Sequence, residues 1–77
     1  MNSVVFALER DKAADATVYN LAAEPVRKIS AGSLYVALGY GMWDGTDDGG
    51  AFVPSGMYIL VIRQAGISSI VRITVVR

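Results

Sequence analysis

The sequence predicts an all-β protein built as an antiparallel β-sandwich of about seven strands. Short runs of β-branched and aromatic residues recur along its 77 residues, and turn signals made of glycine, proline, asparagine and serine separate them. No stretch shows a clear helical period, and there is no internal repeat. A chain of this length has room for one domain, so residues 1–77 are expected to form a single sandwich.

The first two strands are expected at residues 4–8 and 14–19, on either side of a charged surface turn at 9–12. In each run, alternate residues face the same side of a sheet, and these inward positions are apolar. The alanines of the second run also permit a helix. We favour a strand because its Thr-Val-Tyr end prefers extended backbone and turn residues follow soon afterwards.

The middle of the chain is expected to hold a short third strand at 26–29, returning as a hairpin, and a turn at 30–33. Residues 34–43 are β-rich and uncharged, but Gly39 and Gly41 interrupt them. Glycine inside a strand often marks a bulge or a close backbone approach. We therefore expect one bent strand or two short ones, with the first running to Leu38.

The last part of the chain begins with a loop from Trp43 to Tyr58 that holds three aspartates and four glycines. A Pro-Ser-Gly turn leads from this loop into a strand at 57–63. A tight turn at 64–66 and a final strand at 68–76 complete the sandwich.

The expected core combines the inward residues of these strands with the single tryptophan and one tyrosine. Trp43 would be an exposed stacking platform in one interpretation, but a tryptophan that ends a strand of a small sandwich is more often a main core residue. Tyr58 resembles a tyrosine corner, in which the ring is buried and the hydroxyl bonds to upstream backbone. The expected core residues are Phe6, Val18, Trp43, Tyr58, Leu60, Ile62, Ile73 and Val75.

Composition excludes several classes of site. Without cysteine or histidine the chain has no disulfide, thiolate nucleophile, imidazole base or usual zinc ligand. Seven basic residues balance seven acidic ones, which removes the attraction that nucleic-acid binders depend on, so no nucleic-acid partner is expected. The serines lack a neighbouring base, and carboxylates in turns usually serve solubility and capping. We expect neither an enzyme nor a cofactor.

The N-terminal segment is not expected to be a signal peptide or a membrane span. Met1 to Leu8 has no basic lead, its apolar run is short, and charges follow directly at residues 9–12. No membrane insertion is therefore expected. The hydrophobic fraction of 53% is nevertheless high for so small a domain, which indicates apolar surface that meets a protein partner.

Several segments together carry a family likeness. They are Val18-Tyr19-Asn20 with Glu24 and Val26-Arg27, Trp43-Asp44-Gly45 with Asp47-Asp48, Val53-Pro54-Ser55-Gly56 with Tyr58, and the terminal run from Arg72 to Arg77. In these the chain resembles the FlgD-like immunoglobulin-like domain, a module similar to the C-terminal sorting domains of type IX secretion and to a domain of the flagellar hook-capping protein. The resemblance extends over nearly the whole chain.

The resemblance implies an immunoglobulin-like or fibronectin-III-like sandwich with no catalytic activity. It also implies a bacterial protein that acts outside the cell or at the cell surface, in secretion, anchoring or scaffolding. Two positions depart from the family pattern. Ala23 stands where the turn after Asn20 usually has glycine, which predicts a different turn shape, and residues 34–42 look longer and more apolar than their counterparts.

The loop from Trp43 to Tyr58, which we call the acidic loop, offers weak calcium candidates in Asp44, Asp47 and Asp48. Asp44, Thr46 and Asp48 occupy alternate positions as in a calcium-binding loop, and Gly49 stands where such a loop turns sharply. The twelfth position is Ser55, however, where a bidentate glutamate is needed, and no helices are expected on either side. We favour a structural role, in which the carboxylates cap backbone amides of the loop.

The last two strands look apolar on both faces, although a sandwich strand with one buried face should alternate with polar residues. A neighbouring loop that covers the second face would explain this, and so would an assembly surface. The final strand is also a candidate free edge that can pair with another chain. The expected interface residues are Met57, Ile59, Val61, Ile70, Arg72 and Val76.

Two functions follow from these features. The first is a non-enzymatic interaction module that anchors, exports or scaffolds a protein at the cell exterior. The second is a stand-alone structural subunit that associates with copies of itself, as a homo-oligomer or polymer, in an extracellular filament or as a virion decoration protein. Both use the apolar outer residues and the edge of the last strands.

Overall fold

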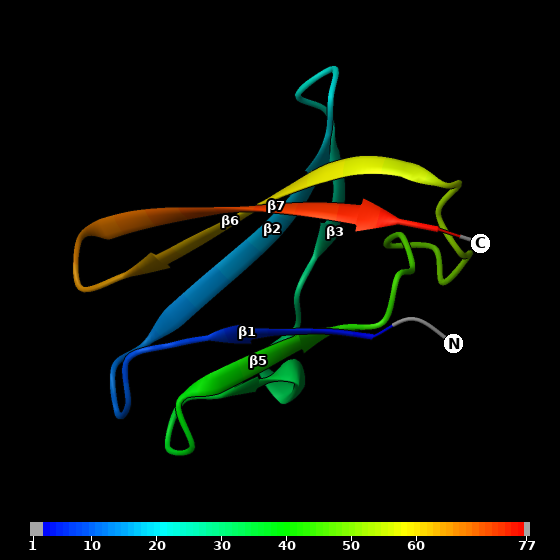
Figure 1. Cartoon of the computed structure of the whole chain (residues 1–77). Helices are drawn as coiled ribbons and strands as arrows, with labels where there is room; N and C mark the ends of the chain where they lie inside the picture. Colours follow the sequence, from blue (N-terminus) through cyan, green and yellow to red (C-terminus); the bar gives the residue numbers. More distant parts are fainter. Residues whose placement is uncertain (1–2, 77) are drawn as a thin grey trace.

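The computed structural model describes residues 3–76 and consists of two antiparallel β-sheets that share one core (Figure 1). One sheet has three strands in the order β1-β5-β4, and the other has four in the order β3-β2-β6-β7. The elements are β1 (Val4–Ala7), β2 (Ala14–Asn20), β3 (Pro25–Lys28), a short 3₁₀ helix η1 (Ala31–Ser33), β4 (Leu34–Tyr35), β5 (Tyr40–Trp43), β6 (Gly56–Gln64) and β7 (Ile67–Val75). The all-β prediction is confirmed, and the two sheets are compatible with a β-sandwich.

Residues 34–43 form two short strands that fold back on each other. The expected strand to Leu38 is wrong, because the chain turns directly after Tyr35 and returns at Tyr40. Gly39 takes a φ of 80°, and its N–H donates to the Tyr35 carbonyl at 2.9 Å. Glycine adopts this left-handed conformation readily. The rings of Tyr35 and Tyr40 stack across the hairpin, with centroids 4.9 Å apart.

The β6–β7 hairpin closes with a two-residue turn, Ala65-Gly66. Both residues have positive φ, 52° and 75°, as a type I′ turn requires. Gln64 and Ile67 pair directly on either side of the turn, and pairing continues along both strands without a register shift. The last strand therefore starts one residue before the predicted position.

The β2–β3 turn is organised by Asn20. Its Oδ1 accepts the N–H groups of Ala22 and Glu24, each at 3.0 Å. Ala23 takes a φ of 62°. Alanine therefore occupies, at a conformational cost, the left-handed position that glycine fills most readily.

Both sheets contribute side chains to the core. All eight residues expected there are buried, together with Ala16, Ile29 and Val53. Phe6 of β1 lies opposite Gly41 of β5, and a Cβ at Gly41 would approach the Phe6 ring to 2.5 Å. The glycine is thus required by a close approach across the three-stranded sheet.

Trp43 and Tyr58 meet edge to face in this core, with ring centroids 5.7 Å apart. The Trp43 Nε1–H donates to the Thr46 carbonyl at 2.8 Å, and the Tyr58 hydroxyl donates to the Pro54 carbonyl at 2.7 Å. Each ring is buried while its polar atom holds one end of the acidic loop. The aromatic pair therefore joins the core to the loop that follows β5.

Candidate protein-interaction surface

The solvent side of the four-stranded sheet carries most of the predicted interface. We call this surface the outer face, formed by Asp15, Thr17, Tyr19, Met57, Ile59, Val61, Arg63, Ser68, Ile70, Arg72 and Thr74. Met57, Ile70 and Arg72 are exposed, whereas Ile59 and Val61 are half-buried. Val76 follows β7 and is also exposed. Five of the six predicted interface residues thus lie together on one face.

Strand register sorts the outer face into rows. Thr17, Val61 and Ile70 lie side by side across β2, β6 and β7. The apolar row ends at Ile70, which is 68% exposed at the border of the sheet. Burial of a large apolar side chain away from water is favourable, and Ile70 does not gain this free energy while it stays exposed. An exposed apolar residue at the end of such a row is typical of a protein-interaction site.

β7 is an unprotected edge strand. It is nine residues long, pairs with β6 without a bulge, and contains no proline and a single charge, Arg72. Within residues 3–76 no strand pairs with its far side. Natural sheets usually blunt such an edge with charges, proline, a bulge or a covering loop, since a regular edge pairs with other chains.

β3, at the opposite edge of the same sheet, carries several of these protections. It starts with Pro25, and its pairing with β2 has a register shift. The acidic loop also covers it: Asp48 donates its N–H to the Val26 carbonyl at 3.0 Å, and Asp48 Oδ1 accepts the Lys28 N–H at 2.9 Å. The four-stranded sheet thus has one covered edge and one open edge.

The three aspartates of the acidic loop each cap backbone amides at a different place. Asp44 accepts the Thr46 amide and hydroxyl, and Asp47 Oδ1 accepts the Gly49 and Ala51 amides at 2.9 and 3.0 Å. Together with Asp48 on β3, these bonds describe a structural loop. Among residues 3–76 there is no group of three acidic side chains placed to hold a metal ion. Calcium binding stays a prediction without geometric support.

The side-chain hydrogen bond from Thr46 lowers the pKa of Asp44 below its ordinary value of 3.8, and the nearby charge of Arg27 also lowers it. Arg27 Nη1 in turn donates to the Asp47 carbonyl at 3.0 Å. The loop therefore contacts β3 through a side chain as well as through Asp48.

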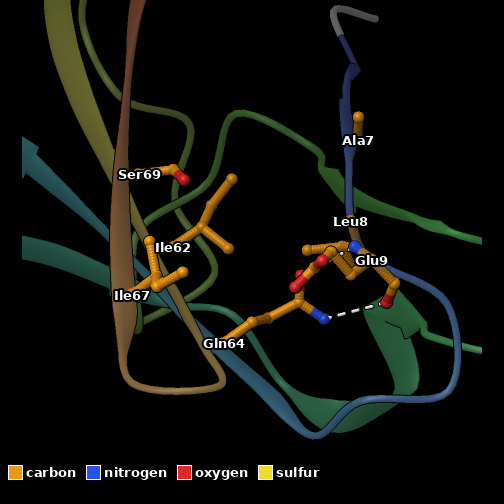
Figure 2. A pocket seen from close by; sticks show the side chains of 7 residues that line it. All are labelled: Ala7, Leu8, Glu9, Ile62, Gln64, Ile67 and Ser69. Carbon is orange, nitrogen blue, oxygen red and sulfur yellow. Dashed lines mark hydrogen bonds between the residues drawn. The ribbon is translucent and has the colours of Figure 1, made fainter.

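A cleft of about 360 Å³ lies between the end of β1 and the β6–β7 hairpin (Figure 2). Its lining is mostly apolar and includes Leu8, Ile62 and Ile67. Ile67 points to the inner side of the sheet but is 65% exposed. The open edge is thus uncovered on its inner side here as well.

Gln64 crosses the cleft and joins β6 to the loop between β1 and β2. Its Nε2 donates to the Glu9 carbonyl at 3.0 Å, and its Oε1 accepts the Glu9 N–H at 2.7 Å (Figure 2). The same Nε2 also donates to the Lys12 carbonyl at 3.0 Å. Residues 64–66 read as a tight turn in the sequence, so this contact of Gln64 was not predicted. The available signal was alternation, since Leu60, Ile62 and Gln64 share the inward side of one strand.

Comparisons of the chain with protein-family models, with curated proteins and with solved structures found no match. The likeness to the FlgD-like domain therefore depends on the residues named in the sequence analysis. No helix within residues 3–76 is both long and apolar enough to cross a membrane.

Proposed function

We propose that this protein is a non-enzymatic immunoglobulin-like module that binds a protein partner through the open edge and outer face of its four-stranded sheet. Its role is export, surface anchoring or scaffolding of an extracellular assembly. The resemblance to the FlgD-like domain supports the immunoglobulin-like assignment and the extracellular address. The two antiparallel sheets are compatible with that assignment.

The observation that carries the proposal is the difference between the two edges. The acidic loop covers β3 with hydrogen bonds, whereas within residues 3–76 the nine residues of β7 form a regular edge that no strand covers. An open edge recruits a partner by strand addition, in which backbone hydrogen bonds give affinity and alternate side chains give specificity. The apolar row ending at Ile70 supplies the side-chain part of such a contact.

Photo-crosslinking in cells that produce the protein tests this proposal. A photoreactive amino acid at Ile70 should give adducts with one protein, which is either a partner of the cell envelope or a second copy of the chain. The same residue at Leu38 is the matched control, because Leu38 is comparably exposed, at 62%, but lies in the β4–β5 turn. Similar adducts at both positions, or a cytosolic partner at Ile70, would contradict the proposal.

The second candidate is a structural subunit that associates with itself, and the apolar row that reaches the border of the sheet favours it. Sedimentation and negative-stain microscopy of the purified chain test this candidate, because a polymer appears as rods, rings or shells. Val61→Lys should dissolve such particles and leave the domain folded, since Val61 faces outward. An unfolded Val61→Lys variant would show that this face is core and remove the main support for assembly.

A further inference from the structure

We propose that the partner of the open edge is a second copy of this chain, with the two β7 strands paired antiparallel about a twofold axis at Ile70. The two four-stranded sheets then become one sheet of eight strands. This inference rests on the proposed function, because it uses the same edge and outer face. It adds the identity of the partner and the register of the contact.

The backbone of β7 has the groups that such a pair needs. A two-residue turn closes with a hydrogen-bonded pair, here Gln64 and Ile67, and hydrogen-bonded and non-hydrogen-bonded pairs then alternate along the ladder. Ile67 and every second residue after it therefore direct their backbone groups toward β6. The N–H and C=O groups of Ser68, Ile70, Arg72 and Thr74 point to the open edge.

A central Ile70 matches this pattern, because its N–H and C=O both point outward. Ile70 of each copy then exchanges two hydrogen bonds with Ile70 of the other, and the pairing spreads equally in both directions. Residues i and j of the two copies are opposite when their numbers add to 140. If the sum were odd, residues of the outer face in one copy would lie opposite residues of the inner face in the other. Only even sums keep the outer faces of the two copies on the same side of the joined sheet.

Charge decides against a centre at Arg72. That register places two guanidinium groups directly opposite each other, and like charges opposite across a strand pair are destabilising. A centre at Ile70 sets Arg72 opposite Ser68 of the second copy. The chain has no net charge, so no overall repulsion opposes the approach of two copies.

Apolar burial decides between Ile70 and its neighbour Val71 as the centre. A centre at Val71 would place each Ile70 against an arginine of the second copy. A centre at Ile70 joins the two apolar rows, so that Val61 and Ile70 of one copy continue into Ile70 and Val61 of the other. On the inner side, this register sets the exposed Ile67 opposite Ile73 of the second copy.

The contact is small, so the dimer should be weak and concentration-dependent. Stable interfaces bury about 1,200–2,000 Å² in total, and one strand pair with a single apolar row falls at or below the lower end. Covalent trapping is therefore the appropriate test. The absence of cysteine makes single-cysteine variants clean probes.

Ile70→Cys should form a disulfide dimer under mild oxidation, because residues directly opposite lie within the reach of a disulfide. Ser68→Cys and Arg72→Cys are the matched controls. Each alone should cross-link at least about tenfold more slowly, since two copies of residue 68 would lie about 14 Å apart along the strands. A mixture of these two variants should cross-link efficiently, because residues 68 and 72 face each other.

Sedimentation of the unmodified chain and of Ile70→Lys completes the experiment. The unmodified chain should shift from monomer toward dimer with concentration, and Ile70→Lys should stay monomeric with an unchanged melting temperature. A chain that remains monomeric, or a dimer in which Ile70→Cys cross-links no faster than Ser68→Cys, would overturn the inference. If the inference fails but Ile70 still gives photo-adducts with a different protein, the proposed function stands. If Ile70 and Leu38 are labelled equally, the proposed function fails as well.

Discussion

At Ala23 an L-residue holds a left-handed backbone conformation that costs about 1–2 kcal/mol. Glycine removes this cost and loses about 0.5–1 kcal/mol in chain entropy, so Ala23→Gly should raise the free energy of unfolding by about 0.5–1 kcal/mol. Ala22, the neighbouring residue of the same turn, has no positive φ. Ala22→Gly should therefore destabilise, and urea denaturation of the two variants should give opposite signs.

At Gly41 the missing Cβ makes room for the Phe6 ring and for Leu34. Gly41→Ala should lower the free energy of unfolding by about 1–3 kcal/mol, because both neighbours are held by the core. Gly32→Ala is the control, since a Cβ at Gly32 meets nothing within 4 Å. Adding Phe6→Leu to Gly41→Ala should recover part of the loss, and a strictly additive double variant would argue against the contact.

The Asp44 carboxylate contributes to stability in a pH-dependent way. Its pKa in the folded protein lies below 3.8, chiefly because the Thr46 hydroxyl donates to it. A depressed carboxylate pKa gives stability that is present above the unfolded value and is lost as pH falls through the folded value. Thr46→Val should bring the Asp44 pKa, measured by NMR titration, back toward 3.8. Thr74→Val, an exposed threonine on β7, should leave it unchanged.

At the scale of elements, Gln64 joins the β6–β7 hairpin to the β1–β2 loop by three hydrogen bonds. Gln64→Ala should lower the free energy of unfolding by about 2–4 kcal/mol, at about 1 kcal/mol for each bond. Arg63→Ala, the exposed neighbour, should cost far less. Hydrogen exchange should show faster opening of the loop at residues 9–12 in Gln64→Ala only. Equal losses for both variants would mean that Gln64 is no tether.

Elements whose signal is local could be predicted from the sequence. Alternation fixed the inward side of β2 and β6, and the type I′ turn at Ala65-Gly66 lies where a tight turn was expected. The β4–β5 hairpin could not be resolved in the same way. The length of β4 depends on where the chain turns before Gly39. One bent strand and two short strands over residues 34–43 have the same composition, so composition does not distinguish them.

At the scale of the whole molecule, contacts between segments that are distant in the sequence could not be predicted. Phe6 packs against Gly41, Gln64 bonds to Glu9, and Asp48 bonds to β3. Each contact joins residues that are far apart in the sequence, and strand propensity and alternation describe only local structure. The core was predictable because burial follows from the period of each strand alone. Alternation predicts that Met57, Ile59 and Val61 share one face of β6, but the inequality of the two sheet edges depends on the path of the acidic loop.

The covered edge at β3 sets a limit on growth. A sheet with one open edge stops after a single pairing event, whereas a sheet with two open edges adds copies without end, as in fibrils. Asp48→Ala removes the acceptor for the Lys28 N–H and loosens the cover. We expect this variant to scatter light and bind amyloid dyes after prolonged incubation, while Asp15→Ala, on the exposed side of β2, does not. Under this proposal, the acidic loop restricts strand addition on the four-stranded sheet to the edge at β7.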